Sequence, residues 1–193
     1  MPRAKQFDEE EVVEKAMTLF WRKGYRNTSL TDLIEYIGIN NASIYNTFGG
    51  KKELFDRTIE HYRKQNYEGM SNFLASQHDI RLGLRSVFRK IIMDDWKDED
   101  KKGCFIANTI SELLPHDPKL MGIIQSYRKD VVKTFQSFLE RGVKDGQIPP
   151  NKDLYNISNL LYTLMMGLKI EAKSKLDPEG SSLRVDMVLS LLD

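Results

Sequence analysis

Apolar residues recur at three- and four-residue spacing along most of the chain, the period of helices that bury one face. Near the N-terminus this spacing predicts three short helices and then a long one: between Asp8 and Gly24, between Ser29 and Gly38, from Asn41 to about Thr47, and from Lys51 onward. Glycine closes each short helix, as expected where the chain turns left-handed. The pattern predicts an all-α fold.

The same period continues to the C-terminus. It predicts helices at about residues 79–97, 103–114, 117–142, 153–172 and 182–192, or about nine helices in total. Asp117-Pro118 is a clear helix start, because an acidic N-cap precedes a proline in the first turn. The run Asp177-Pro178-Glu179-Gly180 is expected to break the chain. We expect an N-terminal domain at 1–50 and a larger helical domain at 51–193, with the helix from residue 51 connecting them.

The second and third predicted helices are separated by a tight turn containing Gly38, which is the arrangement of a helix-turn-helix. In that motif the second helix presents small polar side chains to base edges in the major groove. Five such positions are expected on its exposed face: Asn41, Ala42, Ser43, Asn46 and Thr47. Asparagine pairs with adenine, the hydroxyls bond several bases, and alanine touches a thymine methyl. On pattern alone, a plain three-helix bundle explains these residues equally well.

Composition neither favours nor excludes DNA binding. The chain has 29 basic and 28 acidic residues, a net charge of +1, whereas DNA-binding domains are usually basic. The single cysteine, Cys104, excludes an internal disulfide and fits a reducing, cytoplasmic setting. We find no apolar run long enough to span a membrane, no glycine-rich phosphate loop, no metal-binding histidine pair and no nucleophile elbow. No enzyme activity, cofactor, metal or membrane partner is expected.

Three segments together carry a family resemblance: GYRNTSLTDL from Gly24, GINNASIYNTF from Gly38 and KKELF from Lys51. Over residues 7–56 the chain resembles the TetR family of bacterial regulators. The resemblance implies that Thr28, Tyr45 and Lys51 contact DNA phosphates. A hydroxyl or a lysine beside free backbone N–H groups suits that role. Gly49-Gly50 departs from the family, which more often has a proline and a polar capping residue there.

The last two helices are apolar on more than one face, and residues 160–172 most strongly so. Such a helix needs cover on both sides. The family resemblance implies that these helices pair with their copies in a four-helix dimer interface. Two-fold symmetry would place the recognition helices about 34–36 Å apart on a palindromic operator. Packing within one chain is the alternative.

The resemblance also implies an effector pocket in the second domain, lined by apolar and aromatic side chains. The candidates by position are Phe88, Trp96, Cys104, Phe105, Tyr127, Phe135, Tyr162 and Met166. Ordinary core packing is the alternative for each of the apolar and aromatic candidates.

Cys104 carries a more specific hypothesis. The run GCFIANTISEL from Gly103 resembles a branch of the family in which a Gly-Cys pair opens this helix, and some members of that branch sense electrophiles or oxidants through a cysteine. A thiol in the first turn of a helix lies at the positive end of the helix dipole, which favours the reactive thiolate. The positive charges of Lys101 and Lys102 favour the thiolate as well. The alternative is a small buried cysteine that packs as a hydrophobe.

We therefore predict a ligand- or thiol-responsive transcriptional regulator, a repressor that binds a palindromic operator as a homodimer. A small apolar or electrophilic effector would release it. The alternative is an all-helical small-molecule-binding protein that does not bind specific DNA.

Overall fold

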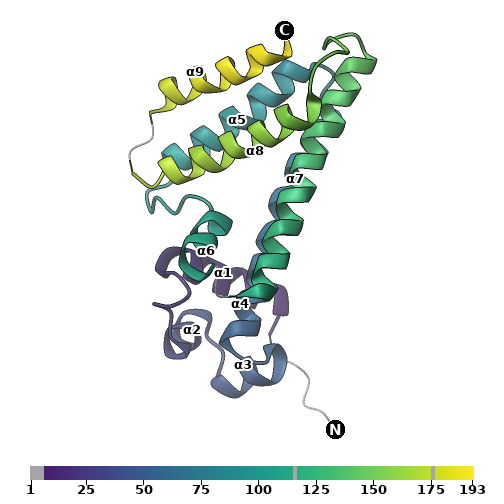
Figure 1. Cartoon of the computed structure of the whole chain (residues 1–193). Helices are drawn as coiled ribbons and strands as arrows, with labels where there is room; N and C mark the ends of the chain where they lie inside the picture. Colours follow the sequence, from purple (N-terminus) through teal and green to yellow (C-terminus); the bar gives the residue numbers. More distant parts are fainter. Residues whose placement is uncertain (1–6, 115–116, 175–176) are drawn as a thin grey trace.

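The computed structural model describes residues 7–114, 117–174 and 177–193, which are helical almost throughout (Figure 1). This part of the chain forms nine α-helices and one short 3₁₀ helix: α1 (Glu9–Lys23), α2 (Leu30–Ile37), α3 (Asn41–Phe48), α4 (Lys51–Ser76), α5 (Ile80–Lys97), α6 (Phe105–Leu113), α7 (Pro118–Lys144), α8 (Leu154–Glu171), α9 (Pro178–Leu189) and η1 (Ser190–Leu192). These ranges contain no β-strand. The predicted all-α class is confirmed.

Capping residues set the limits of α2 and α3. Ser29 accepts a hydrogen bond from the N–H of Asp32, and the Asp32 carboxylate accepts one from the N–H of Ser29. This reciprocal pair is a capping box. The Asn40 side chain accepts a first-turn N–H of α3 at 2.8 Å. Gly38 and Gly49 end the two helices with positive φ, which glycine adopts without a steric penalty.

Helices α1, α2 and α3 pack around a small core that the start of α4 completes. Phe20, Leu33 and Ile44 supply one fully buried side chain from each short helix. Leu54 and Phe55 of α4 join them, and the rings of Phe20 and Phe55 meet edge to face with centroids 5.0 Å apart. The first turns of α4 therefore belong to this N-terminal core before the helix runs on into the larger unit.

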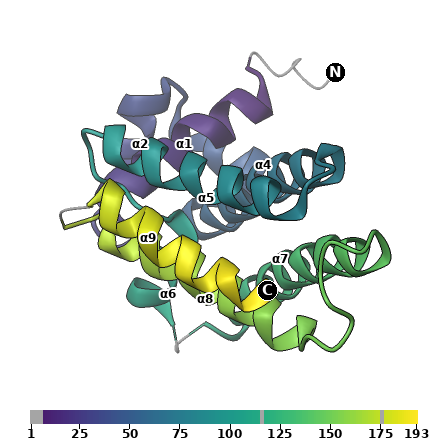
Figure 2. The same ribbon diagram turned by 90° about the horizontal axis from the view of Figure 1, so that it is seen from above.

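The larger unit is built on two long helices, α4 and α7, with α5, α8 and α9 gathered at the end away from α3 (Figures 1 and 2). Helix α7 packs against α8 and α4, and α9 packs mainly against α5. Arg63 of α4 pairs with Asp130 of α7 at 2.6 Å. Phe88 of α5 and Phe135 of α7 stack with centroids 6.3 Å apart. These contacts make one continuous core with the N-terminal helices.

The last helix begins earlier than the sequence analysis expected. Asp177 is the N-cap of α9, and Pro178 occupies its first turn. The predicted break at residues 177–180 is therefore wrong, because these residues start the helix in the same way that Asp117-Pro118 starts α7. The final three residues of the predicted helix form η1 instead.

Candidate DNA-binding surface and effector cavity

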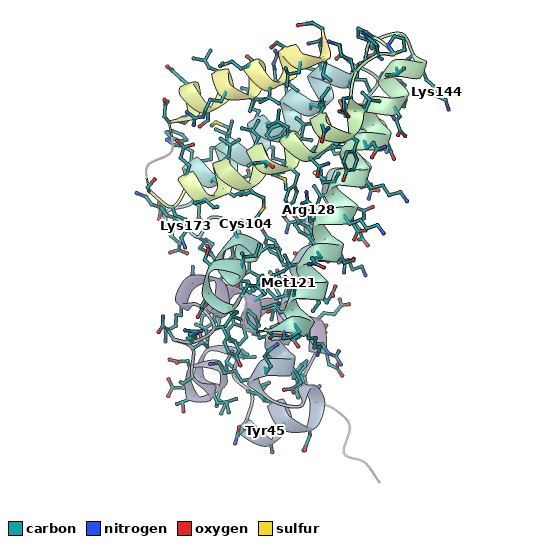
Figure 3. All side chains as sticks on the ribbon, viewed as in Figure 1. Tyr45, Cys104, Met121, Arg128, Lys144 and Lys173 are labelled. Carbon is teal, nitrogen blue, oxygen red and sulfur yellow. The ribbon has the colours of Figure 1, made fainter. Side chains whose placement is uncertain are left out.

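Helix α3 buries one face and exposes the other. Ile44 and Phe48 are 0% and 5% exposed, and they hold the helix against the N-terminal core. The predicted base-reading residues lie on the opposite face. Asn41, Ala42 and Asn46 are exposed, and Ser43 and Thr47 are half-buried. Tyr45 lies at the end of the molecule farthest from α9 (Figure 3). The five predicted residues thus share one helix and are open to a partner on that side.

The Gly49-Gly50 pair has a specific geometric role. Gly49 ends α3 with φ of +96°, and Gly50 precedes α4 with φ of +137°. A Cβ on Gly50 would lie 3.3 Å from Cε1 of Tyr45, so the absent side chain leaves room for that ring. Among the residues that the structure describes, no side chain caps the N-terminus of α4. Its first N–H groups are therefore left for an external acceptor.

Lys51 opens α4 beside this uncapped turn. Its ammonium lies over the ring of Tyr25, 4.2 Å from the ring centroid. Partial burial lowers the pKa of Lys51, while the carboxylates of Glu112 and Asp32 oppose that shift. A cation held at a helix N-terminus can complement a phosphate bound there.

Thr28 is placed differently from its predicted role. Its side chain is fully buried, and its hydroxyl donates to the carbonyl of Gly24 at 2.6 Å. Because the hydroxyl is bonded inside the turn, it is not presented to a DNA phosphate. We assign this side chain to the α1–α2 turn instead.

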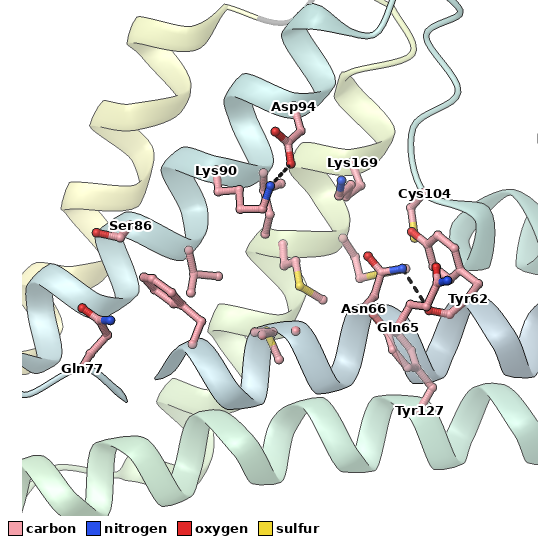
Figure 4. Close-up of a pocket in the computed structure, with 17 residues that line it drawn as sticks. Tyr62, Gln65, Asn66, Gln77, Ser86, Lys90, Asp94, Cys104, Tyr127 and Lys169 are labelled. Carbon is pink, nitrogen blue, oxygen red and sulfur yellow. Dashed lines mark hydrogen bonds and ion pairs between the residues drawn. The ribbon is translucent and has the colours of Figure 1, made fainter. Parts of the chain in front are cut away.

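A cavity of about 680 Å³ lies in the larger unit, among α4, α5, α7, α8 and the start of α6 (Figure 4). Its apolar lining includes Met70, Phe73, Val87, Ile91, Met165 and Met166, and its polar lining includes Tyr62, Gln65, Asn66, Ser86, Lys90, Asp94, Cys104, Tyr127 and Lys169. The cavity reaches the surface, since Gln65, Asn66 and Lys90 are exposed. Its size and mixed lining suit a small organic molecule.

Cys104 lies in the wall of this cavity as the N-cap of α6, and it is 3% exposed. Its sulfur accepts the N–H of Ala107 at 3.5 Å and the hydroxyl of Tyr62 at 3.7 Å. The expected help from Lys102 is reduced, because its ammonium is paired with Asp98 at 2.5 Å and lies 3.3 Å from Asp100. The thiol is thus held by two donors inside a largely buried site.

The described residues contain no cluster of histidine, cysteine, aspartate or glutamate that could hold a metal ion. Within the same ranges, no helix has the length and apolar character needed to cross a membrane.

Two family models match the chain. The model described as bacterial regulatory proteins of the tetR family matches residues 12–58, and the model described as the tetracyclin repressor-like C-terminal domain matches residues 84–184. The chain belongs to the TetR family of bacterial regulators. It is therefore a transcriptional regulator and not an enzyme.

Curated relatives match nearly the whole chain. The uncharacterized regulator YezE of Bacillus subtilis (strain 168) is 29% identical over 194 residues, with full coverage of both chains. The transcriptional repressor ComR of Escherichia coli (strain K12) is 29% identical, covering 94% of this chain and 84% of its own. The biofilm operon negative regulator IcaR of Staphylococcus aureus (strain Newman) is 33% identical, covering 95% and 96%.

A solved structure shares the fold over almost the whole length. A cysteine mutant of the TetR family regulator CifR, in complex with a 26-base-pair operator, superimposes with a TM-score of 0.86. It is 25% identical and the match covers 99% of this chain and all of the other. The reduced form of NemR from E. coli shares the fold with a TM-score of 0.83, at 16% identity and with 93% and 95% of the two chains covered.

The structure places the predicted pocket residues of this TetR-family protein in two groups. Cys104, Tyr127 and Met166 line the cavity. The other five candidates lie outside its lining: Phe88, Phe105, Phe135 and Tyr162 are buried, and Trp96 is 57% exposed. Helical spacing does not distinguish a packed ring from a cavity wall, and Trp96 does not face inward at all.

The polar residues of the cavity were not predicted from the sequence. Gln65, Asn66, Lys90 and Lys169 belong to residue types that usually form the solvated face of a helix. The sequence carries no signal for them, because Tyr67, Met70 and Phe73 continue the three-residue apolar spacing along this part of α4.

Proposed function

We propose that this protein is a homodimeric repressor that binds a palindromic operator through α3 and is released when an effector occupies the cavity. The observation that carries the proposal is the exposed polar face of α3, next to the uncapped N-terminus of α4. Both features suit a helix that enters the major groove with its neighbour resting on the backbone.

The proposed contacts divide into two kinds. Asn41, Ala42, Ser43, Asn46 and Thr47 read base edges, because they share the outward face of α3. Tyr45, which is 50% exposed, and Lys51 bind phosphates. Support for repression comes from the relatives, since ComR is named a repressor and IcaR a negative regulator. CifR supports operator binding, because its structure contains operator DNA.

A second copy of this chain is the proposed occupant of the face formed by α8 and α9. Five large apolar side chains of α8, α9 and the adjoining η1 are 39% to 71% exposed: Leu160, Ile170, Leu183, Met187 and Leu191. Apolar side chains gathered on two adjacent helices typically mark a protein interface. A two-fold pairing through this face would give the two α3 helices the symmetry of a palindrome.

The proposed effector is a small apolar or electrophilic molecule. The cavity has the size of typical ligand sites and a largely apolar lining, and Cys104 supplies a nucleophile in its wall. The alternative for Cys104 is a packing role, with binding in the cavity alone causing release.

The test is selection of operator DNA by the purified protein from a random duplex pool, with and without an alkylating agent. A palindromic consensus supports the dimeric regulator. Its loss on alkylation, prevented by Cys104→Ser, supports a thiol sensor. Enrichment of no sequence in either condition overturns the proposal in favour of an all-helical small-molecule binder that does not recognise specific DNA.

A further inference from the structure

Glu112, near the end of α6, holds the turn between α1 and α2 through the backbone. Its Oε2 accepts the N–H of Tyr25 at 2.9 Å, and its Oε1 accepts the N–H of Arg26 at 2.6 Å. Hydrogen bonds to a carboxylate are stronger than neutral ones, and two together fix orientation as well as distance. The larger unit thus contacts the helix-turn-helix unit at a defined point, the α1–α2 turn.

Gly24 makes this pair of hydrogen bonds possible. It has φ of +83°, and a Cβ at this position would lie 3.0 Å from Oε2 and 3.3 Å from Oε1 of Glu112. The absent side chain therefore lets the carboxylate reach the two N–H groups. On the other side of the turn, the Thr28 hydroxyl donates to the Gly24 carbonyl at 2.6 Å. The turn is held from both sides.

The same turn also contacts the proposed phosphate-binding lysine, Lys51. The ring of Tyr25, whose N–H donates to Glu112, lies beneath the Lys51 ammonium at 4.2 Å. A cation over an aromatic face is attracted by the ring quadrupole. Glu112 thus restrains the backbone of the residue whose ring lies against Lys51.

The opposite end of α6 is fixed at the cavity. Cys104 caps the helix and lines the cavity, and a Cβ on Gly103 would lie 2.7 Å from the Lys169 carbonyl of α8. Helix α6 has nine residues, and the eight residue steps from Cys104 to Glu112 span about 12 Å of helix. Figure 3 shows Cys104 at the level where the two parts of the molecule meet.

We infer that Glu112 is a positioning residue for DNA binding, which aligns α3 and Lys51 with α6 through the backbone N–H groups of Tyr25 and Arg26. This inference rests on the proposed function. Displacement of α6 at its cavity end moves the carboxylate, and the helix-turn-helix unit is then no longer held in the orientation that the operator requires. Because coupling is reciprocal, operator binding also restrains the cavity end of α6.

The test compares Glu112→Gln with Glu140→Gln, using the operator selected from the random pool. Each change removes one negative charge, but among the described parts of the chain the Glu140 carboxylate accepts only from the Gln136 side chain within α7. Glu112→Gln is expected to weaken operator binding at least fivefold, within the usual range of coupling between sites. Glu140→Gln is expected to change it less than twofold. Thermal unfolding confirms that both variants are folded.

The second readout is the rate at which iodoacetamide alkylates Cys104, with and without saturating operator. In the wild type, operator is expected to slow the reaction at least fivefold, and in Glu112→Gln less than twofold. A merely structural role would raise both rates and keep their ratio. Glu112→Asp, which keeps the charge but is too short to reach both N–H groups, is expected to be intermediate.

The possible failures are distinguishable. Wild-type protein that binds operator, with alkylation unaffected by DNA or equally affected in Glu112→Gln, overturns the inference and leaves the proposed function intact. Wild-type protein that selects no DNA overturns the proposed function, and the inference falls with it.

Discussion

The hydroxyl of Tyr62 donates a hydrogen bond to the sulfur of Cys104, 3.7 Å away in the cavity wall. Burial raises the pKa of Tyr62, so its hydroxyl remains a donor through neutral and mildly alkaline pH. The N–H of Ala107 supplies a second donor to the sulfur. These donors stabilise negative charge on the sulfur, whereas burial opposes it. Tyr62 is the donor that can be removed without changing the backbone.

Replacing Tyr62 by Phe is expected to slow alkylation of Cys104 about tenfold, because a hydrogen bond to a charged group contributes about 1.5–3 kcal/mol. The measurement is the rate of reaction with iodoacetamide at fixed pH. Tyr127→Phe is the matched control, since Tyr127 also lines the cavity but no hydrogen bond joins its hydroxyl to the sulfur. A rate in Tyr62→Phe equal to or above that of the wild type would show that the tyrosine shields the thiol.

Substitutions of base-reading and of phosphate-binding residues are expected to change DNA binding in different ways. Lys51→Ala should weaken binding evenly across sequences and reduce the salt slope by about 1, because one phosphate contact is lost. Asn41→Ala and Asn46→Ala should each cost about 1–3 kcal/mol on the preferred sequence and relax the preference at one position per half-site. Titrations of operator and single-base variants at several salt concentrations measure both effects. Identical behaviour of the three variants would contradict the proposed division of roles.

The apolar face of α8 and α9 provides a test of the dimer. Met187 is 71% exposed, and Met187→Asp is expected to dissociate the dimer because it would bury an unpaired carboxylate at the interface. Sedimentation at micromolar concentration distinguishes monomer from dimer. Tyr36→Asp is the matched control, since Tyr36 is 43% exposed but lies on α2. A Met187→Asp protein that sediments like the wild type would exclude this face as the interface.

The helix boundaries could be predicted wherever a single residue decides them. Asp117-Pro118 correctly predicts the start of α7, whereas the prediction of a break at Asp177-Pro178, which carries the same signal, is wrong. The difference lay in the following Gly180, which α9 accommodates inside its first turn. Capping is local chemistry, so both starts were available from the sequence.

The cavity, and the hydrogen bonds between Glu112 and the α1–α2 turn, could not be predicted in this way, because they depend on segments that are far apart in sequence. Glu112 and Tyr25 are 87 residues apart in sequence, and a glutamate near a helix end gives no sign of its partner. Thr28 has a side chain of the type that contacts phosphates, but its hydroxyl donates to a carbonyl inside the turn. Sequence pattern predicts which face of a helix is buried, and tertiary packing decides what that face meets.

A largely buried ion pair joins α5 to α8 beside the cavity. Asp95 Oδ1 lies 2.9 Å from Lys169 Nζ, and the two side chains are 8% and 19% exposed. The other carboxylate oxygen, Oδ2, is buried without a hydrogen-bond partner among the described residues. Burial raises the pKa of Asp95 above its ordinary value, and the Lys169 ammonium only partly offsets this effect. A buried charge with one unsatisfied oxygen is costly even when it is paired.

This imbalance predicts how stability changes with pH. Because the pKa of Asp95 is raised in the folded state, the folded protein binds this proton more tightly than the unfolded chain does. The stability gained from protonated Asp95 is therefore complete below about pH 4, the ordinary aspartate pKa. It is lost as the pH rises through the raised pKa. The free energy of unfolding of the wild type relative to Asp95→Asn should therefore fall between about pH 4 and neutrality, as measured by urea denaturation at a series of pH values. Lys169→Met removes the opposing charge and should steepen the fall. A relative stability that rises with pH would mean that the lysine outweighs burial.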